Sequence, residues 1–466
     1  MNSETEEHRE RPVSEEVAAL IARYDTRVPR YTSYPTAPHF SPAVDEATYR
    51  GWLAALDPAA PLSLYLHVPF CRELCHYCGC HTTAVNHDGP VLSYAETLLA
   101  EIALLDAALG PARPAVQHVA WGGGTPTIMP PAQMRAVMAA LRARFPFRPD
   151  AEIAVEIDPR TVDAAVLDGL AAMGCTRASL GVQDLNERVQ QAVNRIQSRA
   201  VTLACVEGLR ARGIRRINID LMYGLPFQTH DSIRETVALC GEFAPDRVAV
   251  FGYAHVPWMA PHQKLLPEGA LPGPEERWAQ MQATEDALLA AGYVPIGLDH
   301  YARPDDPLTR AAAAGQLHRN FQGYTTDTAA ALLGIGASSI GSLAQGYAQN
   351  LPAVPAWRDA VRAGRLPIAR GIAITDEDRL RRDIIETLMC YGRVDLAEVA
   401  ARHGADPAPL AAAAGPRLAA MAADGLLEWD GRRIAVRPAA RPFVRNAAAC
   451  FDTYLRPDQT RHARAI

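Results

Sequence analysis

Lysine is almost missing from this sequence. Lys264 is the only lysine among 46 basic residues, so arginine carries nearly all of the positive charge. An anion bound by this chain will therefore meet guanidinium groups, which form paired hydrogen bonds with carboxylates. Acidic residues number 52, and the formal net charge is −6. This balance does not suit nucleic acid or an anionic membrane surface, and we expect no nucleic-acid partner.

Long apolar runs are also missing. No stretch has the roughly 20 apolar residues that a membrane-spanning helix needs. Residues Met1 to Glu16 are polar and acidic, unlike the basic and then apolar start of a signal peptide. The nine cysteines are an odd number in a long chain, which favours reduced thiols. We therefore expect a cytoplasmic protein with no membrane partner.

Short β-rich runs alternate with helical patterns from residue 61 onward. Six β-then-α units predict a parallel sheet with right-handed crossovers, and the runs are apolar enough for burial on both faces. A further strand is expected at Tyr293–Leu298. The predicted strands are Leu62–Phe70, Val116–Gly122, Glu152–Ile157, Arg177–Gly181, Arg216–Leu221 and Arg247–Tyr253. The predicted helices are Tyr94–Leu109, a segment after Pro130-Pro131, Thr161–Met173, and a segment from the N-cap Thr229 to about Phe243.

Polar or glycine residues stand at the end of each predicted strand. They are Cys71, Gly122–Thr125, Glu156 with Asp158, Gln183 with Asp184, Asp220, and Tyr253-Ala254-His255. Because active sites of parallel α/β barrels lie at the carboxyl ends of the strands, these residues predict one shared site. The fold class is therefore α/β, with a partial (β/α)6 barrel over residues 61–365.

Two regions flank the predicted barrel. Residues 1–60 hold a charged tail and then Arg30–Ala37, which Pro35 should keep extended over another part of the chain. Residues 366–466 predict a winged-helix-like domain with helix starts at Thr375 and Asp395, an Ala-rich third helix and a hairpin. The third helix offers a single cation, Arg417, which is too few for phosphate binding. We expect this domain to be structural or to act as a lid.

Four cysteines lie between residues 71 and 80. Cys71, Cys75 and Cys78 have the spacing to give thiolates to three irons of a 4Fe–4S cluster and to leave the fourth iron open. A closed zinc site that uses Cys80 or a nearby histidine is the alternative interpretation.

The cysteine spacing, together with Gly122–Thr127 after the second strand, resembles the radical S-adenosylmethionine superfamily. Within it, the chain resembles the oxygen-independent coproporphyrinogen III oxidases from about Arg30 to Arg456. A related haem-chaperone family typically has an aromatic residue at the position of Cys80 and lacks much of His318–Tyr324, so a non-catalytic haem-binding chaperone is the less favoured alternative. Other matching motifs are Glu156–Pro159, Gly181–Asp184, Val193–Arg195, Asn218–Asp220, Asp299–Pro304 and Phe451–Arg456.

This resemblance implies oxidative decarboxylation of two propionate side chains of coproporphyrinogen III to vinyl groups. It implies one 4Fe–4S cluster on Cys71, Cys75 and Cys78, and two molecules of S-adenosylmethionine. The first molecule would contact Tyr65, Gly123, Glu156 and Ile340. The second would contact Tyr77, Gly124, Thr125, Gln183, Arg195, Asp220 and Ala254. We also expect a monomer that takes electrons from a donor such as flavodoxin or ferredoxin.

Three expectations concern particular side chains. Arg195 and Asp220 are expected to bind a cofactor, and the alternative is that they form a structural ion pair with each other. Cys80 is expected to ligate no iron, because a fourth thiolate would leave no place for S-adenosylmethionine. The four substrate carboxylates are expected to bind a set of arginine, tyrosine and amide side chains, namely Arg30, Tyr31, Tyr34, Arg303, Arg319, Asn320 and Gln322.

Overall fold

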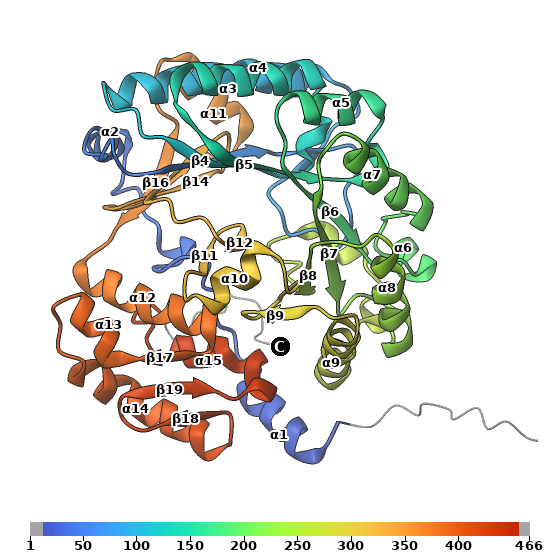
Figure 1. Ribbon diagram of the computed structural model, residues 1–466, viewed down its shortest axis with the longest axis vertical. Helices are drawn as coiled ribbons and strands as arrows, with labels where there is room; N and C mark the ends of the chain where they lie inside the picture. Colours follow the sequence, from blue (N-terminus) through green and yellow to red (C-terminus); the bar gives the residue numbers. More distant parts are fainter. Residues whose placement is uncertain (1–12, 456–466) are drawn as a thin grey trace, which may run out of the picture.

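A twelve-stranded sheet forms the centre of the computed structural model, which describes residues 13–455 (Figure 1). The first twelve residues of the tail and Arg456 lie outside the described residues. The strand order is β16-β15-β14-β13-β1-β4-β5-β6-β7-β8-β10-β9, and the run from β13 to β8 is parallel throughout. The predicted α/β class and the partial barrel are confirmed.

All six predicted strands are present. Strand β5 begins earlier than predicted, at Phe147, and the others agree within two residues. Their apolar character has the expected cause, because β1 is buried along both faces between the outer helices and the barrel interior. The strands are β1 (Leu62–Val68), β4 (Val116–Gly123), β5 (Phe147–Ile157), β6 (Arg177–Gln183), β7 (Arg216–Tyr223) and β8 (Arg247–Gly252).

The barrel gains a seventh parallel strand that the sequence analysis missed. Strand β13 (Ala331–Ile335) is only five residues long, contains Gly334, and pairs with β1. The strand expected at Tyr293–Leu298 exists as β9 (Val294–Ile296), but it is an antiparallel edge strand. The remaining strands of the sheet are β10 (His300–Ala302), β14 (Ile340–Leu343), β15 (Gly346–Asn350) and β16 (Ile368–Ala373).

Helices cover the outer face of the barrel (Figure 1). Two predicted helix starts were wrong. The first helix begins at Gly89, where Pro90 occupies the first turn without loss of a hydrogen bond. The third begins at Ala164, because the Asp163 carboxylate accepts from the Val166 amide and caps it there. The outer helices are α3 (Gly89–Leu109), α4 (Pro131–Arg144), α5 (Ala164–Ala172), α6 (Glu187–Ala192), α7 (Arg199–Ala211), α8 (His230–Glu242), α9 (Pro274–Ala290) and α11 (Val354–Arg362). The short helix α10 (Pro307–Ala313) instead packs against β9 and β10 near the middle of the molecule.

The C-terminal region has the predicted three helices and hairpin. Thr375 and Asp378 form the capping box of α12, and Asp395 caps α13. A third short strand and a final helix complete this region, which lies at the lower left of Figure 1. The predicted boundary at residue 366 stays a prediction. The elements are α12 (Asp376–Tyr391), β17 (Arg393–Asp395), α13 (Leu396–Arg402), α14 (Ala408–Ala423), β18 (Leu427–Trp429), β19 (Arg433–Val436) and α15 (Val444–Ala449).

The N-terminal arm packs against the C-terminal region. Helix α1 (Glu15–Tyr24) and the extended segment after it share a hydrophobic core with α12, α14 and α15, whereas α2 (Glu46–Ala54) packs on the barrel. Tyr31 and Tyr34 are both buried there. The Tyr31 hydroxyl donates to Asp452 over 3.0 Å, and the Tyr34 hydroxyl lies 3.0 Å from that of Thr453. The expectation that this segment lies over another part of the chain is confirmed.

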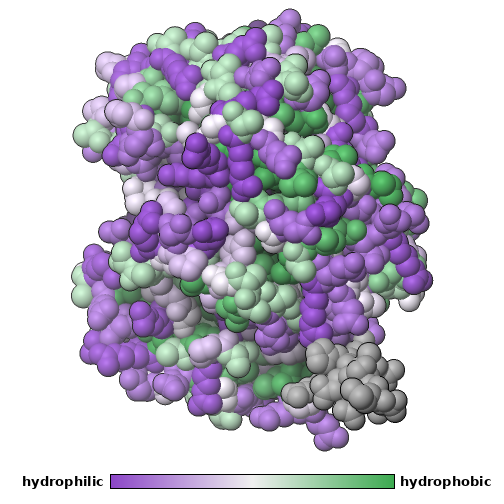
Figure 2. Space-filling model, turned by 45° about the vertical axis from the view of Figure 1, so that its right-hand side comes forward, coloured by the Kyte–Doolittle hydropathy of each residue, from purple (hydrophilic) through white to green (hydrophobic). Residues whose placement is uncertain are grey.

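Hydrophilic and hydrophobic residues are interspersed over the face shown in Figure 2. No helix among residues 13–455 has both the length and the apolar character to cross a membrane.

Candidate active site

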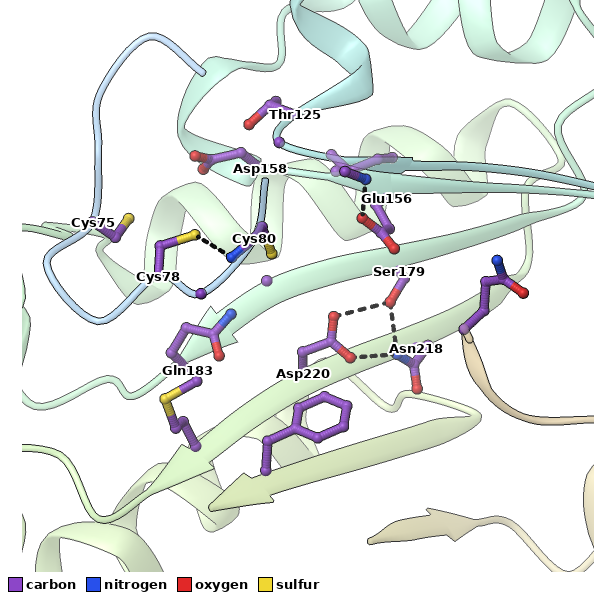
Figure 3. Close-up of a pocket in the computed structure, with 18 of the residues that line it drawn as sticks. Cys75, Cys78, Cys80, Thr125, Glu156, Asp158, Ser179, Gln183, Asn218 and Asp220 are labelled. Atoms are coloured by element: carbon purple, nitrogen blue, oxygen red, sulfur yellow. Dashed lines mark hydrogen bonds between the residues drawn. The ribbon is translucent and has the colours of Figure 1, made fainter. Parts of the chain in front are cut away.

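A cavity of about 710 Å³ lies within the barrel, at the carboxyl ends of the parallel strands. The cysteine loop that follows β1 forms part of its wall, and side chains from β5, β6 and β7 point into it (Figure 3). The wall extends down to His118 and Glu152 near the starts of β4 and β5. Charged side chains of both signs therefore face one enclosed space, where their interactions are stronger than in water.

Backbone contacts fix the cysteine loop against the barrel. Cys71 ends the short strand β2 (Phe70–Cys71), which pairs with β3 (Thr83–Ala84). Further along, the His76 amide donates to the Val193 carbonyl over 2.9 Å. The His262 Nε2 atom lies 2.7 Å from the Cys78 carbonyl oxygen. The loop is thus held from two sides, so its sulfurs have defined positions.

Each of the three predicted ligand sulfurs has a hydrogen-bond donor. Thr125 donates to Cys71 Sγ over 3.4 Å, Arg195 to Cys75 Sγ over 3.6 Å, and the Cys80 amide to Cys78 Sγ over 3.4 Å. Hydrogen bonding from Cys80 also lowers the pKa of the Cys78 thiol to about 6. Such donors stabilise the thiolate, which is the form that binds metal, so these side chains suit an iron–sulfur cluster.

Among residues 13–455, no group of three or more histidine, cysteine, aspartate or glutamate side chains is arranged around one ion, and this includes the cysteines of the loop.

The glycines after β4 make room for other parts of the chain. A Cβ atom on Gly124 would lie 2.5 Å from the Phe70 carbonyl oxygen, and one on Gly122 would lie 2.8 Å from Glu156 Oε1. Gly123 has φ 117°, a conformation that side-chain-bearing residues rarely adopt. The sequence analysis attributed these glycines to close approach of a ligand, and the structure adds close packing of the cysteine loop.

Glu156 is a buried carboxylate that faces the cavity. Its Oε2 atom accepts from the Gly123 amide over 3.1 Å. Burial, with the nearby charge of Asp220, raises the pKa of Glu156 to about 7. A positively charged ligand group would reverse this shift, because it favours the ionised carboxylate.

Asp220 is oriented by two neutral neighbours. Ser179 donates to one of its oxygens over 3.1 Å, and Asn218 donates to the other over 2.9 Å (Figure 3). Burial raises the pKa of Asp220. Asn218 and Asp220 are two residues apart on β7, so both point into the barrel, and this period-two spacing was visible in the sequence.

Arg195 pairs with Asp158, and the predicted alternative of an ion pair with Asp220 was wrong. The Arg195 Nη2 atom lies 3.3 Å from Asp158 Oδ1 and 2.6 Å from the Gly181 carbonyl oxygen. Arg160 binds the same carboxylate over 2.7 Å. The Nε atom of Arg195 is buried without a hydrogen-bond partner, so one donor remains for a ligand. The sequence analysis noted Asp158 at its strand end but missed its role as the partner of both arginines.

Gln183 has an unusual backbone conformation. Its φ is 71°, and the pairing of β6 with β7 shifts register between Gly181 and Gln183. A strained residue at the end of a barrel strand is typical of a functional site.

The structure brings most of the predicted residues to the cavity wall. Cys71, Cys75, Cys78, Tyr77, Gly123, Gly124, Thr125, Glu156, Gln183, Arg195, Asp220, Ala254, Arg30, Asn320 and Gln322 line it. Cys80 also lines it. Tyr65, Ile340, Tyr31, Tyr34, Arg303 and Arg319 are outside this lining set.

Arg303 was wrongly placed at the substrate site. Strand β10 runs antiparallel to β8, with Ala302 beside Arg247 at the start of that strand. The chain therefore returns to the end of the barrel away from the cysteine loop, where exposed Arg303 pairs with Asp305 over 3.2 Å.

Comparisons with known proteins agree with this geometry. The model of the radical SAM superfamily matches residues 65–240, and that of the HemN C-terminal domain matches residues 374–443. The chain is 51% identical over 450 residues to the oxygen-independent coproporphyrinogen III oxidase of Bradyrhizobium diazoefficiens, covering 96% of this chain and all of that one. Identity to the enzyme of the same name from Escherichia coli is 42% over 438 residues, with 94% and 95% covered.

A solved structure extends the likeness to three dimensions. The coproporphyrinogen III oxidase HemN from Escherichia coli, described as a radical SAM enzyme, superimposes with a TM-score of 0.88 at 40% identity, covering 94% of this chain and 99% of that one. The resemblance in the sequence is confirmed: this chain belongs to the oxygen-independent coproporphyrinogen III oxidase family of the radical SAM superfamily.

Proposed function

We propose that this enzyme decarboxylates two propionate side chains of coproporphyrinogen III to vinyl groups, giving protoporphyrinogen IX in anaerobic haem synthesis. The observation that carries the proposal is that Cys71, Cys75 and Cys78 all line the 710 Å³ cavity, together with the carboxylates of Glu156 and Asp220. Figure 3 shows Cys75, Cys78 and both carboxylates. A cavity of this volume lies within the range of sites that bind organic ligands in proteins.

Cys71, Cys75 and Cys78 would hold the 4Fe–4S cluster, whose fourth iron would take S-adenosylmethionine. When bound, these groups supply a carbon radical that removes a hydrogen atom from the substrate. The donors to the three sulfurs support this ligand set. The exposed Cys80 contributes its backbone amide to Cys78, which is consistent with a role other than ligation.

The cavity wall carries carboxylates on different strands, Glu156 on β5 and Asp220 on β7, which supports a position for each of two S-adenosylmethionine molecules. Glu156, beside Gly123, would accept from the amino group or ribose hydroxyls of the first molecule, with Tyr65 on β1 and Ile340 on β14 as its further contacts. Asp220 would pair with the ammonium of the second, and the unpartnered Nε of Arg195 would donate to its carboxylate. Tyr77, Gly124, Thr125, Gln183 and Ala254 complete that second position.

Arg30, Asn320 and Gln322 are the predicted substrate residues that line the cavity. Tyr31 and Tyr34 act through the arm, since their hydroxyl groups hold it against the C-terminal segment. We further propose that the enzyme works as a monomer in the cytoplasm and takes electrons from flavodoxin or ferredoxin. Nine free cysteines suit such a reducing compartment.

Anaerobic turnover tests the proposal. The protein is reconstituted with iron and sulfide and incubated with coproporphyrinogen III, S-adenosylmethionine and a reductant. Carbon dioxide, methionine and 5′-deoxyadenosine should form in step with vinyl groups. Stable haem binding without any of these products would instead favour the haem-chaperone alternative.

A further inference from the structure

A second, smaller cavity lies where the N-terminal arm, the barrel and the C-terminal region meet. Its volume is about 50 Å³, and its wall includes Arg30 from the arm, Arg277 from α9 and Arg445 from α15. About 10–15 Å³ is enough for one water molecule, so the space accepts a carboxylate-sized group. We call it the junction cavity.

Positive charge exceeds negative charge around the junction cavity. Arg319 lies next to it and pairs with Asp299 over 3.6 Å, and Asp299 is the carboxylate of the cavity wall. Asp299 also lies 2.8 Å from His300 Nδ1, and it is the one carboxylate among the described residues that line this cavity. Arg30 and Arg277, in contrast, bring two cations to the cavity wall. The adjacent Arg441 adds nothing to this excess, because it pairs with Glu285 over 2.9 Å.

Two of these arginines have no carboxylate partner. Within residues 13–455, neither Arg30 nor Arg277 forms an ion pair within 4.0 Å. Arg30 donates to the Gly252 carbonyl over 2.9 Å, but this neutral acceptor does not neutralise the positive charge of the guanidinium group. Arg277 Nε is buried with no hydrogen-bond partner. Buried cations without a counter-charge are unfavourable, so the cluster is suited to an incoming anion.

The positions of Arg30 and Gly252 indicate which anion enters. Both residues line the junction cavity and the large cavity, so the two spaces adjoin there. Gly252 is the last residue of β8, and Gly123 is the last residue of β4. In the sheet, β8 is the fourth strand along from β4. A carboxylate at the junction cavity therefore belongs to a propionate remote from the one that reacts beside Gly123.

We propose that the junction cavity binds the carboxylate of a propionate side chain that the reaction retains, through Arg30, Arg277, Arg319 and Arg445. The proposal rests on the proposed function, because it takes coproporphyrinogen III as the substrate. The bound carboxylate links the three parts of the chain that meet there. Arg445 already donates to the Pro29 carbonyl over 3.0 Å, so it connects this site to the arm.

Arg277→Gln tests the site with little disturbance, because α9 keeps its backbone hydrogen bonds and the side chain has no ion pair to lose. Anaerobic equilibrium dialysis measures the Kd of coproporphyrinogen III. The Kd should rise about 10- to 100-fold, as expected for loss of a charged hydrogen bond. KM should rise in parallel with kcat nearly constant, since the retained carboxylate is bound equally before and during reaction. Arg277→Met replaces the glutamine variant if that variant fails to fold.

Arg303→Gln is the matched control, because it removes an exposed arginine at the other end of the barrel. Its Kd should equal that of the wild type. An unchanged Kd in the folded Arg277 variant overturns the proposal.

A free anion is the other source of a carboxylate. Sodium acetate that raises the wild-type melting temperature without weakening substrate binding would identify a free-anion site and overturn the assignment to the substrate. A wild-type protein that neither binds nor converts coproporphyrinogen III would instead contradict the proposed function.

Discussion

Arginines in the large cavity and arginines at the junction cavity have opposite surroundings. In the large cavity, Arg160 and Arg195 share Asp158, Arg177 pairs with Glu152 over 2.9 Å, and Arg247 pairs with Asp306 over 2.8 Å. At the junction cavity, Arg319 pairs with Asp299 over 3.6 Å, whereas Arg30 and Arg277 form no ion pair within residues 13–455. Paired arginines are neutralised by their carboxylate partners, whereas Arg30 and Arg277 keep a charge that a ligand carboxylate can neutralise. The proposed binding of one of the four substrate carboxylates at the junction cavity depends on this difference.

Among changes in the large cavity, loss of a cysteine ligand of the cluster should reduce activity the most. Cys71→Ser, Cys75→Ser and Cys78→Ser should each lose iron and all activity, because each removes one thiolate from the proposed cluster. Cys80→Ser should retain close to wild-type iron and sulfide. Iron analysis after anaerobic reconstitution measures this. A Cys80 variant without its cluster, beside one of the other three that keeps it, would contradict the ligand assignment.

Asp220→Ala and Arg195→Ala should abolish vinyl formation and leave iron content unchanged, because both side chains serve the second cofactor position. Equilibrium dialysis should find fewer molecules of S-adenosylmethionine bound than in the wild type. Undiminished binding and turnover would mean that the enzyme does not use a second molecule at this position.

Asp158→Asn should destabilise the protein by about 3–5 kcal/mol, because it leaves Arg195 and Arg160 without their shared counter-charge in a buried site. The double variant Asp158→Asn/Arg195→Gln should recover part of this loss, since one unpaired charge is then removed. Anaerobic melting temperatures measure both effects. If Asp158→Asn melts like the wild type, the contrast between paired and unpaired arginines has no energetic basis.

A smaller, pH-dependent effect on folding stability is expected from Glu101. This buried carboxylate accepts hydrogen bonds only from neutral donors, including Trp357 Nε1 at 3.0 Å. Burial raises the pKa of Glu101 to about 7. The folded state then holds the proton more tightly than the unfolded state, so stability falls as pH rises from about 4.5 to about 7.

Glu101→Gln does not titrate at this position. The free energy of unfolding of the variant, relative to that of the wild type, should therefore rise by about 2 kcal/mol between pH 5 and pH 8. Melting temperatures at the two pH values measure the difference. A constant difference between the two proteins would show that Glu101 stays ionised throughout.

The strands and the cysteine loop were predictable from local patterns, because apolar runs and cysteine spacing are properties of neighbouring residues. Strand β13 was not, since five residues that include a glycine give too weak a signal. Arg303 was misplaced for a different reason: the direction of β10 in the sheet decides which end of the barrel it reaches. The pairing of Arg195 with Asp158 and the cluster around Asp299 join distant segments, and no sequence spacing encodes them.

Hydrogen transfer from the substrate tests the proposed chemistry most directly. Coproporphyrinogen III labelled with deuterium at the β-carbons of its propionates is converted anaerobically by the reconstituted enzyme, and the 5′-deoxyadenosine is analysed by mass spectrometry. We expect deuterium in 5′-deoxyadenosine, with two carbon dioxide molecules released for each protoporphyrinogen IX. Vinyl formation with unlabelled 5′-deoxyadenosine, or no decarboxylation at all, would contradict radical chemistry in this cavity.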